Sequence, residues 1–194
     1  MEIGATKAVQ DRLKTTKIEE SKGASLVFCW DTHLTKIKGR NVLFIVNASN
    51  RYTIAMTDIE PRNWNYYAMY IIRVIHGMMQ EMGYSEEQIE QYFKMSGDTT
   101  ITKTHGRKSV GGINRMVMDA QYFGKKLEKE AKYQWELSEY LNRDICQPEG
   151  FDAYGYPNEL FKLDMERLGI ATKRKPAKVI DFTRYIDTNR SSNH

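Results

Sequence analysis

Two strongly β-forming runs joined by a very short link constrain the fold of this chain more than any other feature. Asn41–Asn47 reads NVLFIVN and is almost wholly apolar and β-branched, as a central strand is. Arg51–Thr57 (RYTIAMT) follows after only Ala-Ser-Asn. A link of this length joins antiparallel neighbours, so the two runs are predicted to form a hairpin. A further strand candidate, Ser25–Leu34, precedes them and extends the hairpin into an antiparallel meander.

Helical periodicity dominates the rest of the chain. Pro61 suits the first turn of a long helix that is predicted to run to about Met82, with apolar residues at helical spacing. Ser85 and Gln88 have the capping-box spacing of a second helix start. Other segments complete the prediction: helices over 6–13, from about 108, over 125–142 and over 157–168, and short strands over 1–5 and 99–104. The predicted fold class is α+β, a mainly antiparallel sheet packed by a long helix and several further helices.

Length and composition favour one ordinary globular unit. The chain has 194 residues, of which 41% are hydrophobic and 28% charged, enough to enclose one full core. We expect a single α+β domain over residues 1–170, followed by a basic C-terminal extension over 171–194. The extension carries six Lys and Arg side chains against two Asp. The net charge of +4 permits binding to nucleic acid or to an acidic protein without requiring either.

Several classes of protein are disfavoured. No segment approaches eighteen consecutive apolar residues, and charges interrupt the first fourteen residues, so we expect no membrane association and a cytoplasmic location. Only two cysteines occur, Cys29 and Cys146. Two thiols with two distant histidines make a poor set of metal ligands, so the sequence predicts no metal and no cofactor.

The segment 103–115, KTHGRKSVGGINR, is the strongest candidate for a binding site because it holds five basic side chains and no acid. Those side chains are Lys103, His105, Arg107, Lys108 and Arg115. The segment runs from a β-like stretch through a loop into a helix start, where cations and backbone N–H groups favour an anion. We predict that it binds a nucleic acid or an acidic protein surface together with Lys173, Arg174 and Lys175. A solvated loop before an ordinary helix is the alternative interpretation.

Two other functions stay open. Alternation along a strand places Asp31 and His33 on one face, and an Asp–His pair can act as a general base. This favours a nuclease or other hydrolase, although no nucleophile motif or carboxylate cluster accompanies the pair. The other alternative is a structural or oligomerisation module that pairs through the aromatic, methionine-rich surface of the long helix. The sequence does not predict the oligomeric state, and the leading prediction is a non-enzymatic binding protein.

Five short pieces occur in an order that carries a resemblance. They are Ala5-Thr-Lys7, Trp30-x-x-His33-Leu34, Val46-Asn-x-x-x-Arg-Tyr-x-Ile54, Lys103-Thr104 with Arg107 and Asn114, and Tyr156-Pro-Asn-Glu159. Together they resemble an uncharacterised family of bacterial proteins from Firmicutes and their phages and plasmids, over about residues 1–165. The resemblance implies no established enzyme. Membership among mobile elements implies a counter-defence role, including inhibition of a CRISPR-Cas9-type nuclease, which is a nucleic-acid-processing protein.

Overall fold

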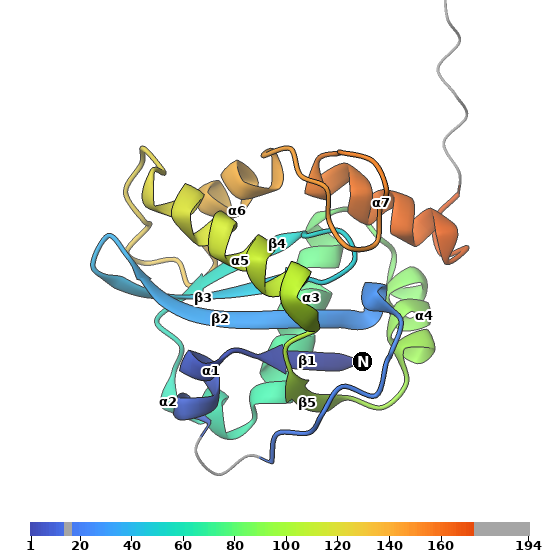
Figure 1. Cartoon of the computed structure of the whole chain (residues 1–194), viewed down its shortest axis with the longest axis horizontal. Coiled ribbons are helices and arrows are strands. Elements are labelled where there is room, and N and C mark those ends of the chain that lie inside the picture. The colour runs from blue at the N-terminus through green and yellow to red at the C-terminus, as the bar shows by residue number, and fades with distance from the viewer. Residues whose placement is uncertain (14–16, 173–194) are drawn as a thin grey trace, which may run out of the picture.

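A five-stranded mixed sheet forms the centre of the molecule in the computed structural model, which describes residues 1–13 and 17–172 (Figure 1). The strand order is β4-β3-β2-β1-β5. The strands are β1 (Glu2–Ala5), β2 (Cys29–Ile37), β3 (Arg40–Asn47), β4 (Thr53–Thr57) and β5 (Thr100–Lys103). The longer pairings, β2 with β3 and β3 with β4, are antiparallel, whereas β1 is parallel to both β2 and β5. The predicted α+β class is confirmed.

Two tight turns make the meander. Lys38 and Gly39 both have positive φ, 48° and 83°, and they connect Ile37 directly to Arg40 in the β2–β3 pair. Two successive residues of this conformation match the right-handed twist of the flanking strands. In the link between β3 and β4, the Asn47 side chain accepts hydrogen bonds from two following backbone N–H groups, at 3.0 and 3.3 Å. The predicted hairpin therefore forms where the sequence placed it.

Helices cover both faces of this sheet (Figure 1). One face is covered mainly by α1 (Lys7–Arg12), α3 (Tyr67–Glu81), α4 (Glu86–Ser96) and α7 (Pro157–Arg167), whose apolar side chains enclose the larger core with those of the strands. The opposite face is covered by α5 (Gly106–Gln121) and α6 (Trp135–Asn142). Two short helical segments remain, α2 (Pro61–Asn65) and the 3-10 turn η1 (Leu26–Phe28). Alternate side chains of each buried strand thus enter different cores, which explains the continuous apolar run in β3.

The structure corrects two helix predictions. The helix expected from Pro61 to Met82 is broken at Tyr66, which has φ −117° and ψ 44° and separates α2 from α3. The helix expected over 125–142 forms only from Trp135 onward. The residues just before it form main-chain hydrogen bonds with the edge strand β4 instead of forming a helix. The Thr57 N–H, for example, donates to the Lys132 carbonyl at 2.7 Å.

Side chains of α6 continue this cover along β4. Asn142 makes two buried hydrogen bonds with the backbone of Thr53, accepting from its N–H and donating to its carbonyl, both at 2.8 Å. The Ser138 hydroxyl accepts from the Ala55 N–H at 3.0 Å. An exposed strand edge offers unpaired backbone groups, and here polar side chains of a helix occupy them. In the described residues, no helix combines the length and apolar character that crossing a membrane requires.

Candidate functional site

The start of α5 brings the predicted cationic segment to one end of the sheet. β5 ends at Lys103, and only Thr104 and His105 separate it from the first residue of α5, Gly106. Gly106 has φ 92°, a conformation that a side chain disfavours, and its N–H donates to the Thr104 carbonyl at 3.0 Å. The helix therefore begins two residues earlier than the sequence predicts, and the loop before it is very short.

The five basic side chains of this segment have different surroundings. Lys103 is exposed at the β5 edge and forms an ion pair with Glu20. Arg115, two turns into α5, contacts Asp119 at 3.2 Å. Lys173, Arg174 and Lys175, the other predicted binding residues, lie outside the described residues. Two of the cations near Gly106 are thus paired with acids of this chain.

Arg107 and Lys108 are both exposed on the first turn of α5, and neither forms an ion pair with a described acid. Arg107 also has no hydrogen-bond partner among residues 1–13 and 17–172, whereas Lys108 donates to the Pro148 carbonyl at 3.3 Å. A further cation, Arg51, donates to the Gly112 carbonyl of α5 at 3.1 Å. Arg51 and Lys108 line the same depression of about 210 Å³, which Glu149 also lines without forming an ion pair with either cation among the described residues. The structure thus adds a cation, Arg51, that sequence reasoning missed.

His105 lies in the interior, with a side chain that is only 4% exposed. Its Nδ1 is 2.7 Å from Oδ1 of Asp31, and its Nε2 is 2.9 Å from Oε2 of Glu2. Burial alone lowers the pKa of His105, but hydrogen bonds with Asp31 and Cys29 outweigh burial and raise the pKa to about 10. His105 therefore joins two acidic strand residues as an imidazolium rather than contributing to an accessible patch.

Glu2 is a second buried acid in this cluster. Burial by itself raises the pKa of Glu2, but hydrogen bonds from the Ser21 hydroxyl, the Lys22 N–H and His105 outweigh burial and lower that pKa. Ser21 donates to Oε2 at 2.6 Å, and the Lys22 N–H donates to Oε1 at 2.8 Å. The carboxylate is thus held in its ionised form by three residues from two segments, Ser21 and Lys22 from one and His105 from the other.

Asp31 is the anion that serves the start of α5. Its carboxylate is fully buried and accepts from the His105 N–H at 3.2 Å, from the His105 ring, and from the Ser109 hydroxyl. A helix start stabilises negative charge, and here a side chain of the protein supplies that charge. The sequence suggested that backbone N–H groups at this helix start would bind an external anion. The His105 N–H instead donates to the internal carboxylate of Asp31.

Asp31 and His33 do not form a hydrogen bond with each other among the described residues. The ring Nδ1 of His33 lies 3.2 Å from the Thr6 hydroxyl instead, and burial lowers the pKa of His33. The histidine partner of Asp31 is His105. The hydrolase alternative depends on a pair formed by Asp31 and His33, whereas in the structure Asp31 pairs with His105.

Cys29 brings a thiol to the same buried cluster. The potential ligand atoms of Glu2, Cys29 and His105 all lie within 4.8 Å of one another. Sequence reasoning missed this set, because it depends on the parallel pairing of β1 with β2, which places Glu2 opposite Cys29. The signal available in the sequence was Glu2, the single charged residue of the otherwise apolar strand β1.

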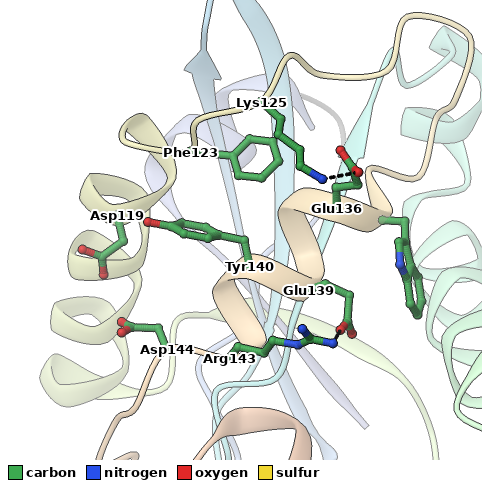
Figure 2. A pocket seen from close by; sticks show the side chains of 9 residues that line it. Asp119, Phe123, Lys125, Glu136, Glu139, Tyr140, Arg143 and Asp144 are labelled. Atoms are coloured by element: carbon green, nitrogen blue, oxygen red, sulfur yellow. Dashed lines mark hydrogen bonds and ion pairs between the residues drawn. The ribbon is translucent and has the colours of Figure 1, made fainter.

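A separate depression of about 580 Å³ lies between α5 and α6 (Figure 2). The Phe123 and Tyr140 rings approach to 5.5 Å between centroids, and the aromatic side chains lie among carboxylates. Two of those acids are neutralised locally, since Lys125 contacts Glu136 at 2.6 Å and Arg143 contacts Glu139 at 2.9 Å. The other acids that line it are Asp119, which Arg115 contacts, and Asp144. This end of α5 is therefore acidic and aromatic, unlike its start.

The oligomerisation alternative depends on the aromatic, methionine-rich surface of the long helix, and its aromatic stretch over residues 64–70 is divided between interior and surface. Trp64, Tyr67 and Tyr70 are buried, whereas Tyr66 and Met69 are more than half exposed. Trp64 and Tyr67 stack with their ring centroids 5.5 Å apart. Three of the four aromatic rings of this stretch therefore pack inside the protein.

Comparison with known proteins gives one match. The profile of a family described as Domain of unknown function (DUF6933) matches residues 2–160, which is most of the chain. That range agrees with the span of about 1–165 over which the short sequence pieces occur. No curated protein and no solved structure matches this chain.

Proposed function

Since the chain belongs to the DUF6933 family, whose description assigns no activity, we propose a function from its surface chemistry. We propose that it is a non-enzymatic binding protein that receives a nucleic acid, or an acidic surface of a nucleic-acid-processing protein, at the start of α5. Arg51, Arg107 and Lys108 make the principal contacts. Lys103 and Arg115 contribute from either side, once the partner replaces Glu20 and Asp119 as their acidic contacts.

The observation that carries this proposal is the absence of an ion-pair partner for these three cations within residues 1–13 and 17–172. Arg107 has no partner there, and Arg51 and Lys108 donate only to neutral carbonyl oxygens. A guanidinium without a carboxylate partner keeps its donors for a bidentate contact with phosphate or carboxylate. Exposed pairs such as Lys103–Glu20 contribute about 0–1 kcal/mol, so an incoming polyanion replaces them at little cost.

The buried cluster supports the proposal by fixing the position of the cationic turn. His105 and Ser109, on either side of Arg107 and Lys108 in the sequence, both bond to Asp31 of β2. These contacts hold the first turn of α5 against the sheet while Arg107 and Lys108 stay exposed. A preorganised pair of cations loses less conformational freedom on binding than a flexible loop does.

The class of partner follows from this chemistry and from the family resemblance. An origin in phages or plasmids, which the resemblance implies, makes a host defence nuclease of the Cas9 type the specific protein candidate. Such nucleases bind nucleic acid in charged channels, and their sites are targets that a small protein can occlude. A nucleic acid itself is the other candidate, and the two are separated by experiment.

Charge reversal tests the proposal. The double variant R107E/K108E is compared with R73E/K94E, which reverses two exposed cations on α3 and α4, across the sheet from α5. Binding is measured to single- and double-stranded DNA, to RNA and to a purified Cas9-type nuclease. We expect R107E/K108E to lose at least about tenfold in affinity for one of them, while R73E/K94E keeps the affinity of the unaltered chain. Equal affinities for both double variants contradict the proposal.

Salt dependence distinguishes the two partner classes. Binding to DNA or RNA weakens steeply as salt rises, because each neutralised phosphate releases counterions, and R107E/K108E reduces that slope. A protein complex with a packed interface shows a shallower dependence. Turnover of nucleic acid by the unaltered chain that disappears in His33→Ala would instead support the hydrolase alternative.

A further inference from the structure

We propose that Glu2, Cys29 and His105 form a binding site for a divalent transition metal of the zinc class. A thiolate, an imidazole and a carboxylate are the three side-chain groups that zinc takes as ligands in proteins. Their ligand atoms come from β1, from β2 and from the loop before α5, and all lie within 4.8 Å of one another. The proposal concerns the interior and does not rest on the function proposed above.

The spacing requires only small movements. Zinc bond lengths of about 2.0–2.3 Å put the ligand atoms of a tetrahedral site about 3.4–3.8 Å apart. Nε2 of His105 and Oε2 of Glu2 are 2.9 Å apart, so this pair opens by about half an ångström when a metal enters. The cysteine sulfur lies within 4.8 Å of both atoms, so it needs to move by no more than about an ångström.

Asp31 already provides the outer support that a metal-binding histidine needs. Its Oδ1 lies 2.7 Å from Nδ1 of His105, and a donated Nδ1–H leaves Nε2 as the atom facing Glu2. Most metal-ligating histidines donate their other ring N–H to a carboxylate or carbonyl in this way. Ser21 and the Lys22 N–H orient the Glu2 carboxylate similarly.

Protons balance the exchange. In the metal-free protein the His105 ring bonds to carboxylates through both nitrogens, and the Cys29 thiol lies 3.4 Å from the Ser25 carbonyl. Metal binding takes the Nε2 proton and the thiol proton to solvent, so two protons leave for each divalent ion bound. Affinity therefore rises with pH.

A buried hydroxyl without a partner in the described part of the chain lies on the strand next to β1. Oγ1 of Thr102 is buried and has no hydrogen-bond partner among residues 1–13 and 17–172, an arrangement that is uncommon in folded proteins. Thr102 pairs with Gly4, which in turn pairs with Asp31, so it belongs to the same face of the sheet as the cluster. A zinc ion with three protein ligands has room for one further oxygen ligand, such as a water.

The burial of the cluster assigns the metal a structural role. Glu2 and Cys29 are at most 3% exposed, and the His105 side chain is 4% exposed. An ion at this point joins segments that are far apart in the sequence, and it stabilises the fold by its binding free energy. The expected effect is a metal-dependent increase in Tm rather than a catalytic activity.

The test uses the full chain with a cleavable tag that contains no histidines, so that the tag binds no metal. The tag is placed at the C-terminus because the Met1 amino group donates a hydrogen bond to the Asp98 carbonyl at 2.8 Å. Metal content is measured after purification and after adding one equivalent of zinc. Cobalt(II) is then substituted to detect a sulfur-to-cobalt charge-transfer band. Cys29→Ser is the test variant, and Cys146→Ser, which alters the other buried free cysteine, is the matched control.

The proposal predicts one metal per chain, a charge-transfer band and a rise in Tm with zinc for the unaltered protein and for Cys146→Ser. It predicts that Cys29→Ser loses the band and binds zinc at least about tenfold more weakly. His105→Gln, with His33→Gln as its control, gives the same contrast through a second ligand. An unaltered protein that binds neither metal, or a Cys29→Ser chain that keeps the band and the zinc affinity, overturns the assignment.

Discussion

A Cβ atom on Gly4 would stand only 1.8 Å from Oδ1 of Asp31, the carboxylate opposite it on the neighbouring strand. The same atom would lie 3.0 Å from Nδ1 of His105. The space above Gly4 is thus occupied by the Asp31–His105 hydrogen bond. Glycine at this position is required by a close approach of side chains, since Gly4 does not have a positive φ.

Gly4→Ala is therefore expected to lower the free energy of unfolding by about 1–3 kcal/mol, because a methyl group must displace a buried hydrogen-bonded pair. Urea denaturation followed by circular dichroism measures the change. Gly77→Ala, on the helix α3 with no atom near its added Cβ, is the control and should be neutral or slightly stabilising. If the two variants have the same free energy of unfolding, the space above Gly4 is not crowded as described.

The His105 cluster also predicts how stability depends on pH in metal-free protein kept in a chelator. The folded-state pKa of His105, raised to about 10, exceeds its ordinary value of 6.5. The protonated ring thus contributes fully below about pH 6.5, and this contribution disappears as pH rises toward 10. Denaturant midpoints should fall across that range, and His105→Gln should remove most of the decline. A profile that His105→Gln leaves unchanged speaks against an imidazolium at this position.

Glu2 has the opposite effect at acidic pH. Its pKa is lowered in the folded protein, so its contribution is present above the ordinary value near 4.5 and is lost as pH falls below it. Glu2→Gln should accordingly flatten the acidic side of the stability profile and lower the neutral plateau by about 1–3 kcal/mol. Exposed Glu130 provides a control substitution, Glu130→Gln, which should change neither side of the profile.

Asn142→Ala tests the cover of the β4 edge. Removing this side chain leaves the Thr53 N–H and carbonyl without their partner in α6, and we expect a loss of about 2–4 kcal/mol in unfolding free energy. Asn114→Ala, at an exposed position of α5, should change stability by less than about 0.5 kcal/mol. Hydrogen exchange at Thr53 should accelerate only in Asn142→Ala, which locates the effect at this edge.

Tyr92→Phe removes a hydroxyl that connects two segments of the larger core. That hydroxyl accepts from the Trp30 indole N–H at 2.9 Å and donates to the Val27 carbonyl at 2.7 Å. Both groups lose a buried partner, so we expect a cost of about 1–3 kcal/mol and a changed tryptophan emission spectrum. Tyr122→Phe, at a ring that is 79% exposed, should affect neither measurement.

The sequence predicted most clearly what local pattern determines. The meander of β2, β3 and β4 could be predicted because period-two and apolar runs are separated by turn residues. The capping box at Ser85 is present as the spacing indicated. The break at Tyr66 was not predictable from periodicity, because Trp64 and Tyr67 are both buried and both fit a continuous apolar stripe.

The buried cluster was not predictable for a different reason. Glu2, Cys29 and His105 are distant in sequence and meet only because β1 inserts in parallel between β2 and β5. A four-residue strand carries no pattern that specifies its neighbours. His105 therefore counted as one surface cation among five, although its environment is set by the acids on the strands beneath it.

Both outer strands of the sheet have main-chain hydrogen-bonding partners beyond it. Residues around Lys132 and the side chains of α6 bond to β4, and the Glu19 backbone bonds to β5 through Ile101 and Lys103. A ligand that binds by adding its own strand to a sheet needs an unoccupied row of backbone groups. Recognition by this protein is consequently expected to depend on side-chain chemistry, and edge-to-edge polymerisation is disfavoured by the same contacts.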